Sequence, residues 1–198
     1  MHNGLDAMIY TKNLKKNKVS NIVYPILAFT LWGTQFVATK YTTDYLSITT
    51  IGFFRFLIAV IPLYIILRRR HSTIKIKKKD YKYFFLIGLM GYYLNIDFNI
   101  AGIKYAGASL GALVTMLNPI LISILAAVIL KEKLTIKKVI CLFMTIGGVY
   151  IVLLDNIEAG KLIGILMILF SAINWSIASV FMRKMNEEYD SLVVTCYG

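Results

Sequence analysis

Long apolar stretches of about twenty residues alternate with short polar segments along most of the chain. A bilayer core of about 30 Å requires roughly 20 apolar residues in a helix that rises about 1.5 Å per residue. Membrane barrel strands instead alternate apolar and polar residues over about ten positions. A seventh apolar stretch begins near Ser191 and reaches Gly198. The pattern predicts six membrane-spanning helices, over Ile22–Thr39, Leu46–Leu67, Tyr83–Ile103, Ala106–Leu130, Ile136–Leu154 and Leu162–Met182.

The composition agrees with a membrane protein and adds no cofactor site. Hydrophobic residues make up 58% of the chain and charged residues 16%. Soluble domains have about 45–50% apolar and about 25% charged residues. Cys141 and Cys196 lie inside apolar stretches, and neither belongs to a metal-binding or disulfide spacing. We therefore expect no metal and no cofactor.

Basic residues lie mainly on one side of the predicted spans. Of the 22 lysines and arginines, 18 fall in the N-terminal tail and in alternate loops, while Lys40, Lys104 and Lys161 fall on the other side. This asymmetry follows the positive-inside rule, which explains the net charge of +12 better than a nucleic-acid partner does. We expect a multi-pass protein of the cell (inner) membrane with a cytoplasmic N-terminus.

The end of the first predicted span is similar to the end of the sixth. Leu31–Lys40 aligns with Asn174–Arg183, with a tryptophan, a valine and the final basic residue in register. The offset spans five helices, so a second copy would enter the membrane upside down, as in many secondary transporters. We expect an all-α bundle with a basic tail at 1–21, a five-helix repeat at 22–154, and the start of an inverted second repeat at 162–198. We expect this chain to be a fragment of a protein of roughly ten helices, or a natural truncation of one.

Several segments together resemble the EamA family of the drug/metabolite transporter superfamily. They are Leu31–Phe36, Arg55-Phe56, Ala108–Leu113 with Asn118–Ile120, Lys131–Thr135 and Gly147–Ile151. The resemblance covers residues 22–198. It implies an inverted-repeat carrier with a substrate cavity near its centre. Lys131 stands where the family often has glycine, a difference that affects only the expected turn geometry.

Two ionisable residues, Arg55 and Asp97, lie inside predicted spans. A charge at the bilayer centre costs about 2.5–3.5 kcal/mol on insertion scales, so such residues are functional candidates. At about 1.5 Å per residue, Arg55 lies roughly 13 Å and Asp97 roughly 9 Å below the same surface. These depths predict an ion pair. The functional alternatives are an ion pair that switches, or a substrate-anion site on Arg55 with Asp97 as a proton carrier. The structural alternative is a static pair that fixes helix packing.

Other polar and aromatic residues within the spans are candidates for binding a substrate. In the third span, Asn95 and Asn99 share one helix face and Tyr93 shares another with Asp97, which predicts a central helix. The first, fourth and sixth spans contribute an aromatic and amide set: Trp32, Gln35, Asn118, Asn174 and Trp175. Interhelical hydrogen bonds and a kink at Pro119 are the structural alternatives. Gly107 and Gly111 predict tight helix packing.

The sequence favours a transporter over an enzyme. We expect alternating-access export of small metabolites, amino acids or drug-like compounds across the lipid bilayer, with protons as a candidate coupling ion. A membrane-embedded lipid-modifying enzyme is the alternative from another class, but the sequence carries no nucleophile, zinc or phosphate-loop motif. A further alternative is a chain that is inactive unless it forms a dimer or meets a missing C-terminal half.

Overall fold

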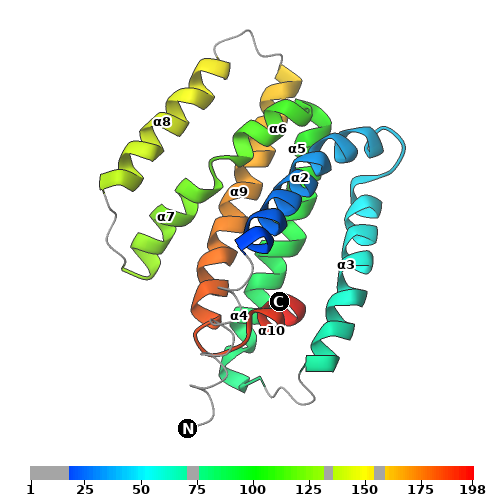
Figure 1. Cartoon of the computed structure of the whole chain (residues 1–198). Coiled ribbons are helices and arrows are strands. Elements are labelled where there is room, and N and C mark those ends of the chain that lie inside the picture. The colour runs from blue at the N-terminus through cyan, green and yellow to red at the C-terminus, as the bar shows by residue number, and fades with distance from the viewer. Residues whose placement is uncertain (1–17, 71–75, 132–135, 154–158) are drawn as a thin grey trace.

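The protein is a bundle of helices whose most extensive contact joins α9 (Ala159–Met185) to α5 (Asn95–Ala106) (Figure 1). A computed structural model describes residues 18–70, 76–131, 136–153 and 159–198, and none of these residues forms a strand. This architecture confirms the predicted all-α membrane fold. The other helices are α2 (Lys18–Thr42), α3 (Ile48–Arg70), η1 (Lys78–Asp80), α4 (Tyr81–Leu86), η2 (Ile87–Leu94), α6 (Ala108–Thr115), α7 (Asn118–Ile129), α8 (Ile136–Leu153) and α10 (Ser191–Tyr197).

Five helical segments of the described chain are long and apolar enough to cross a bilayer. They are Ile22–Thr42, Ile48–Arg70, Lys78–Ala106, Ala108–Ile129 and Ala159–Met185. Each corresponds to a predicted span. α8 corresponds to the predicted fifth span, although its apolar part is the shorter stretch Lys138–Gly148 and Leu154 lies outside the described residues. Most of the predicted basic tail also lies outside them.

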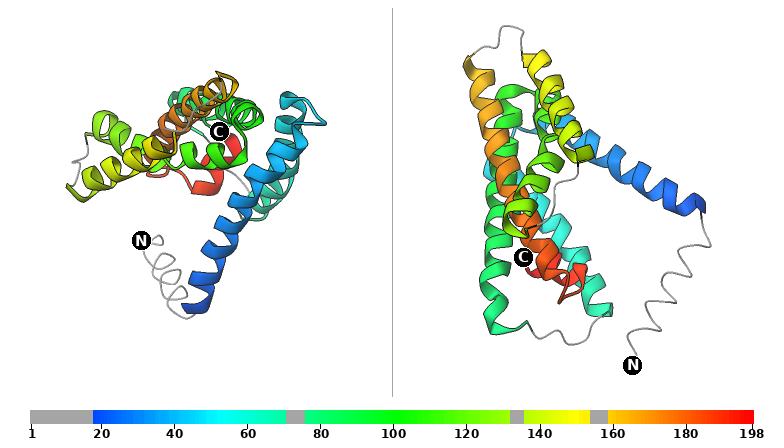
Figure 2. Two further views of the ribbon diagram at one scale, coloured as in Figure 1. Left: turned by 90° about the horizontal axis from the view of Figure 1, so that it is seen from above. Right: turned by 90° about the vertical axis from the view of Figure 1, so that its left-hand side faces the viewer.

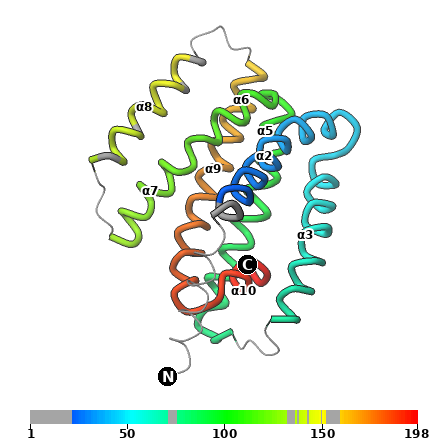
Figure 3. Tube along the Cα trace, viewed as in Figure 1, coloured from blue at the N-terminus to red at the C-terminus, as the bar shows by residue number. Residues whose placement is uncertain are grey.

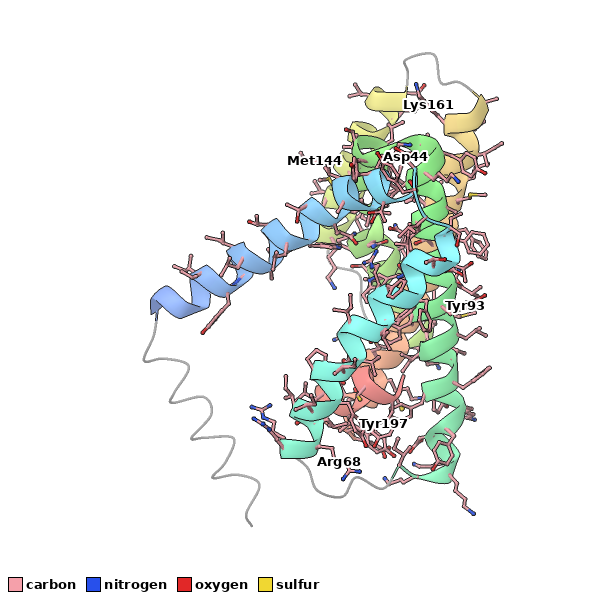
Figure 4. The ribbon with its side chains drawn as sticks, turned by 90° about the vertical axis from the view of Figure 1, so that its right-hand side faces the viewer. Asp44, Arg68, Tyr93, Met144, Lys161 and Tyr197 are labelled. Carbon is pink, nitrogen blue, oxygen red and sulfur yellow. The ribbon has the colours of Figure 1, made fainter. Side chains whose placement is uncertain are left out.

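The chain runs up and down between two ends of the bundle (Figure 3). Arg68 lies at one end and Lys161 at the other (Figure 4). We call the first the basic end, because α3 and α9 finish there in Arg68–Arg70 and Arg183-Lys184 and η1 begins there. The N-terminal half of α2 projects away from the bundle (Figure 2), and its other half contacts α5 and α6.

The tightest helix contact joins α5 to α9. A Cβ atom added to Gly164 would lie 2.5 Å from the backbone nitrogen of Ala106 and 2.8 Å from the carbonyl oxygen of Gly102. A Cβ atom on Gly102 would in turn overlap the side chain of Ile168. Small residues are common where membrane helices approach closely, because dispersion contacts rather than water exclusion hold them together. Backbone-to-backbone packing of α5 on α9 therefore forms the centre of the bundle.

The fourth span is broken between α6 and α7, at residues 116–117. Pro119 lies in the first turn of α7, where its missing N–H removes no helix hydrogen bond. Gly107 turns the chain from α5 into α6 with a φ of 89°, a conformation that favours glycine. No atom lies within 4 Å of a Cβ placed on Gly107, so the packing role predicted for it is wrong. Gly111 is tightly packed, against Ile103.

A clasp of charged and polar groups closes the basic end. Lys77 Nζ lies 2.7 Å from Glu188 Oε2, and Lys79 Nζ lies 3.6 Å from Glu188 Oε1. The hydroxyl of Tyr189 donates to Oδ2 of the buried Asp80 at 2.7 Å and accepts from the backbone N–H of Lys77 at 3.2 Å. These contacts join the start of the third span to the turn that follows α9.

An apolar cluster lies directly behind this clasp. Phe84, Ile87, Met185 and Val194 are its buried members, and Tyr189 packs edge-on against Phe84 with ring centroids 5.5 Å apart. The cluster is built from α4, η2, α9 and α10 together, so it fills the space between these elements near the basic end. We call these buried residues the apolar plug.

Replacing Gly164 with alanine should destabilise the bundle by about 1–3 kcal/mol, because the new methyl group meets backbone atoms that cannot move aside. Gly147→Ala is the matched control, since a Cβ atom there meets no atom within 4 Å. Thermal unfolding in detergent, followed by size-exclusion elution, measures both. Equal midpoints for the two variants would contradict the proposed packing.

The clasp should weaken in acid. The ammonium of Lys77 donates a hydrogen bond to Glu188 and lowers the pKa of that carboxyl below its ordinary value of about 4.3. A carboxyl with a lowered pKa stabilises the fold fully above the unfolded pKa and loses that effect as the pH falls through the folded pKa.

Hydrogen exchange at the amide of Lys77, corrected for intrinsic rates, should therefore become faster as the pH falls below about 4. Glu188→Gln should remove this acceleration of exchange in acid. Glu187→Gln, a change at the neighbouring exposed glutamate, should retain it. Identical pH profiles for the two variants would show that the Lys77–Glu188 contact does not tie the two segments.

Candidate functional site

A polar cavity of about 280 Å³ lies among the membrane-spanning helices. Its walls come from α2, α3, η2, α5, α6, α7 and α9. Seven of the ten residues predicted to bind substrate line it: Trp32, Gln35, Arg55, Asn95, Asn99, Asn118 and Trp175. The other lining residues are Gly91, Tyr92, Ile96, Thr115, Ser171 and Ala172. The cavity therefore gathers groups from stretches of the chain that are far apart in sequence.

Arg55 crosses from α3 to α2 inside the membrane-spanning region. Its Nη2 donates a hydrogen bond to Oε1 of Gln35 at 2.7 Å. A guanidinium has five N–H donors, so a single amide acceptor satisfies a small part of its capacity. Arg55 forms no ion pair with any carboxylate of the described residues. The cavity consequently carries a positive charge that its own walls do not neutralise.

The ion pair predicted between Arg55 and Asp97 is not formed. Asp97 points toward Gly52 instead, with its Oδ1 3.1 Å from the position that a Cβ atom on Gly52 would occupy. Gly52 precedes Arg55 by about one helical turn, so Asp97 contacts α3 at a different level from Arg55. Asp97 is absent from the cavity wall. Similar depth in the membrane was therefore not sufficient to predict contact.

Two of the polar residues predicted in the third span, Asn95 and Asn99, line the cavity, and Tyr93 does not. Asn95 accepts a hydrogen bond from the hydroxyl of Ser171 at 2.7 Å and donates to the carbonyl of Gly91 at 3.1 Å. Asn99 lies one turn further along the same wall. Tyr93, also predicted, is 54% exposed and lies outside the cavity. This difference agrees with the sequence spacing, which puts Tyr93 and Asp97 on another face of the third span than Asn95 and Asn99.

Asn118 lies at the break between α6 and α7, in the first turn after it. The residue is only 8% exposed, yet its Oδ1 has no hydrogen-bond partner within the described part of the chain. Thr115, on the other side of the break, uses its hydroxyl to donate to the carbonyl of Gly111 at 2.7 Å. Buried polar atoms are nearly always paired, and an exception indicates a ligand, water or ion. Asn118 Oδ1 is therefore a buried acceptor that no group in the described part of the chain satisfies.

Both tryptophans of the chain, Trp32 and Trp175, line the cavity. They come from α2 and α9, and Tyr92 adds a third aromatic ring from η2. Asn174, predicted to accompany Trp175, is 4% exposed and donates to the carbonyl of Phe170 at 2.8 Å, so it serves α9 rather than the cavity. Adjacent helix positions point about 100° apart, which separates the two neighbours.

Sequence analysis did not select Tyr92 or Thr115 for the site. Tyr92 follows a glycine in the π-helical segment, and no periodic pattern in the sequence marks that segment. Thr115 could have been found from its position three residues before Asn118, since both flank the break. Small hydroxyl residues in apolar helices carry a weak signal, because most of them bond their own backbone.

A second, mainly apolar cavity of about 390 Å³ adjoins the first. Trp32 and Thr115 belong to the walls of both cavities. The remaining wall of the second cavity is apolar or proline: Phe29, Gly33, Phe36, Ala112, Met116 and Pro119. The polar centre therefore continues into an apolar space between α2 and the broken fourth span.

Comparison with known proteins places this architecture in a family. The model of the EamA-like transporter family matches residues 19–154. The chain belongs to the EamA-like transporter family. This membership confirms the resemblance drawn from the sequence motifs and identifies a multi-pass membrane protein of a transporter family. Among the described residues, no cluster of His, Cys, Asp or Glu could hold a metal ion.

Three relatives illustrate the match. An uncharacterized transporter from Archaeoglobus fulgidus is 30% identical over 85% of this chain and 59% of its own length. The uncharacterized transporter YyaM of Bacillus subtilis is 30% identical over 89% of this chain and 60% of its own length. YvbV of the same organism is 25% identical over 84% of this chain and 55% of its own. The chain thus spans about three fifths of the length of these relatives, and no solved structure matches it.

Proposed function

We propose that the protein acts in a carrier that moves small organic molecules across the cell membrane by alternating access. The observation that carries this proposal is the polar cavity within the membrane-spanning helices. Its walls contain one charged group, several amides and both tryptophans. Lipid-facing surfaces gain nothing from such groups, whereas a solute in transit requires them. Membership of a transporter family supports the same conclusion.

The contacts at the basic end support a state in which the cavity is closed toward the cytoplasm. By the positive-inside rule, we place the basic end and the N-terminus in the cytoplasm. The clasp and the apolar plug lie at that end, and Tyr92 both lines the cavity and packs against the plug. A solute in the cavity would have to separate these contacts to reach the cytoplasm. We propose that opening of the clasp exchanges access between the two sides during export.

The helix directions support an inverted repeat. α2 ends, and α9 begins, at the end opposite the basic end, where Lys40 Nζ donates to the carbonyl of Lys104 at 3.2 Å. The two helices that are similar in sequence therefore run in opposite directions (Figure 1). We propose that helices equivalent to the additional length of the relatives, or a second copy of this chain, complete the carrier. Asp97 is the candidate for carrying a coupling proton.

Transport into proteoliposomes tests this function. The protein, reconstituted with the additional segment that its longer relatives carry, should accumulate at least one solute from a panel of amino acids, metabolites and drugs. Arg55→Ala should reduce the rate about ten-fold or more, because it removes the charge in the cavity. Arg68→Ala, at the basic end, is the matched control and should retain transport. No transport of any solute, with or without a proton gradient, would contradict the proposal.

A further inference from the structure

Two lysines from different spans share one aromatic ring at the basic end. Lys82 in α4 and Lys184 in the last turn of α9 place their Nζ atoms 5.1 and 5.0 Å from the ring centroid of Tyr83. An ammonium within about 6 Å of a ring centroid is attracted by the electrons of the ring. Phe181 stacks on the same ring, with centroids 5.7 Å apart, and holds it in place. Tyr83 therefore brings together two cations that are far apart in sequence.

Neither of these ammonium groups is neutralised within the described part of the chain. Lys82 and Lys184 are exposed, and neither forms an ion pair with a described residue. The carboxylate of Glu188 pairs with the lysines of the clasp, and Glu187 pairs with neither ammonium. Because each Nζ lies within 5.1 Å of one centroid, the two are at most about 10 Å apart, close to the Debye length at 0.1 M salt. Such a pair of like charges attracts a shared anion.

The two lysines lie where their spans reach the surface of the bilayer. Lys82 is in the first turn of α4, near the start of the third span, and Lys184 is near the end of α9. Phe85 lies about one helical turn further into the membrane than Lys82, on the same helix face, and is 72% exposed. A charged surface above an exposed aromatic side chain fits a lipid, whereas a free phosphate has no apolar part to cover Phe85.

The chemistry of the pair favours an anionic headgroup. The oxygens of a phosphate accept charge-assisted hydrogen bonds, and lysine is a common phosphate ligand. One phosphate has enough oxygens to accept from both ammonium groups. Phosphatidylcholine also carries a phosphate, but its choline cation is repelled by the lysines. Basic pockets between membrane helices on the cytoplasmic side bind anionic headgroups by the same attraction.

We propose that Lys82, Tyr83 and Lys184 form a binding site for the phosphate of an anionic phospholipid. The phosphate neutralises both ammonium groups, and an acyl chain of the lipid lies over Phe85. The lipid thereby joins α4 to α9 at the basic end, beside the clasp that joins the same two spans. None of these residues lines the polar cavity, so the inference does not depend on which solute the protein carries.

Native mass spectrometry of the full chain, released from detergent micelles, counts the lipid molecules that remain bound. The chain is titrated with phosphatidylglycerol and, separately, with phosphatidylcholine that has the same acyl chains. The first phosphatidylglycerol should bind about ten-fold or more tightly than phosphatidylcholine, because each lysine near an anionic headgroup adds to the attraction.

Paired variants test whether these two lysines are responsible. Lys82→Gln with Lys184→Gln should weaken phosphatidylglycerol binding about ten-fold or more and leave phosphatidylcholine binding unchanged. Arg69→Gln with Arg70→Gln is the matched control, because it removes the same charge from the basic end, on α3, and should retain the preference. Thermal unfolding without lipid shows that each variant is folded. Added phosphatidylglycerol should raise the midpoint of the wild type and the control pair but not that of the lysine pair.

Several outcomes would overturn the proposal. If the two pairs of variants bind phosphatidylglycerol equally, the total charge of the basic end attracts the lipid and the assigned site is wrong. Equal affinity for the two lipids, or no bound lipid, contradicts the site as well. Glycerol 3-phosphate at the concentration of phosphatidylglycerol should not displace the lipid, and displacement would show a site for free phosphate. The transport assay is independent, so the carrier function stands or fails separately.

Discussion

The centre of this protein is organised by one positive charge placed where the surrounding medium is least able to solvate it. Arg55 lies inside a membrane span, and its single described polar partner is the amide of Gln35. A buried cation is costly unless polar groups or anions surround it. The amides that converge from α2, α5 and α7 make such an environment, which lipid cannot supply. The polar cavity is the structural consequence of that charge.

The helices can surround this cavity because two other features hold them in place. The glycine contact between α5 and α9 brings two backbones together without intervening side chains, which fixes the wall that carries Asn95 and Trp175. The break in the fourth span then presents Asn118 from the opposite wall. Neither feature involves a charged group. Packing of small residues and one proline therefore determine where the polar chemistry lies.

Much of this arrangement could be predicted from the sequence, because bilayer thickness and hydrophobic length are tightly linked. The spans, the basic end and seven members of the cavity wall follow from apolar length, charge distribution and polar residues inside apolar runs. The failures have local causes. Tyr93 and Asp97 share a helix face that does not line the cavity, and Asn174 donates to the backbone of its own helix. Lys131 adopts a φ of 55°, a conformation that is uncommon for residues other than glycine.

Water access to the cavity tests the central claim most directly, because α2 exposes residues both to the cavity and to lipid. With Cys141 and Cys196 replaced by serine, Gln35→Cys should react rapidly with a small water-soluble thiol reagent in membranes. Val37→Cys, at a position that is 65% exposed on the outer surface of α2, should react slowly because lipid covers it. Slow reaction of Gln35→Cys, or equal rates for the two variants, would contradict a solvated binding cavity around Arg55.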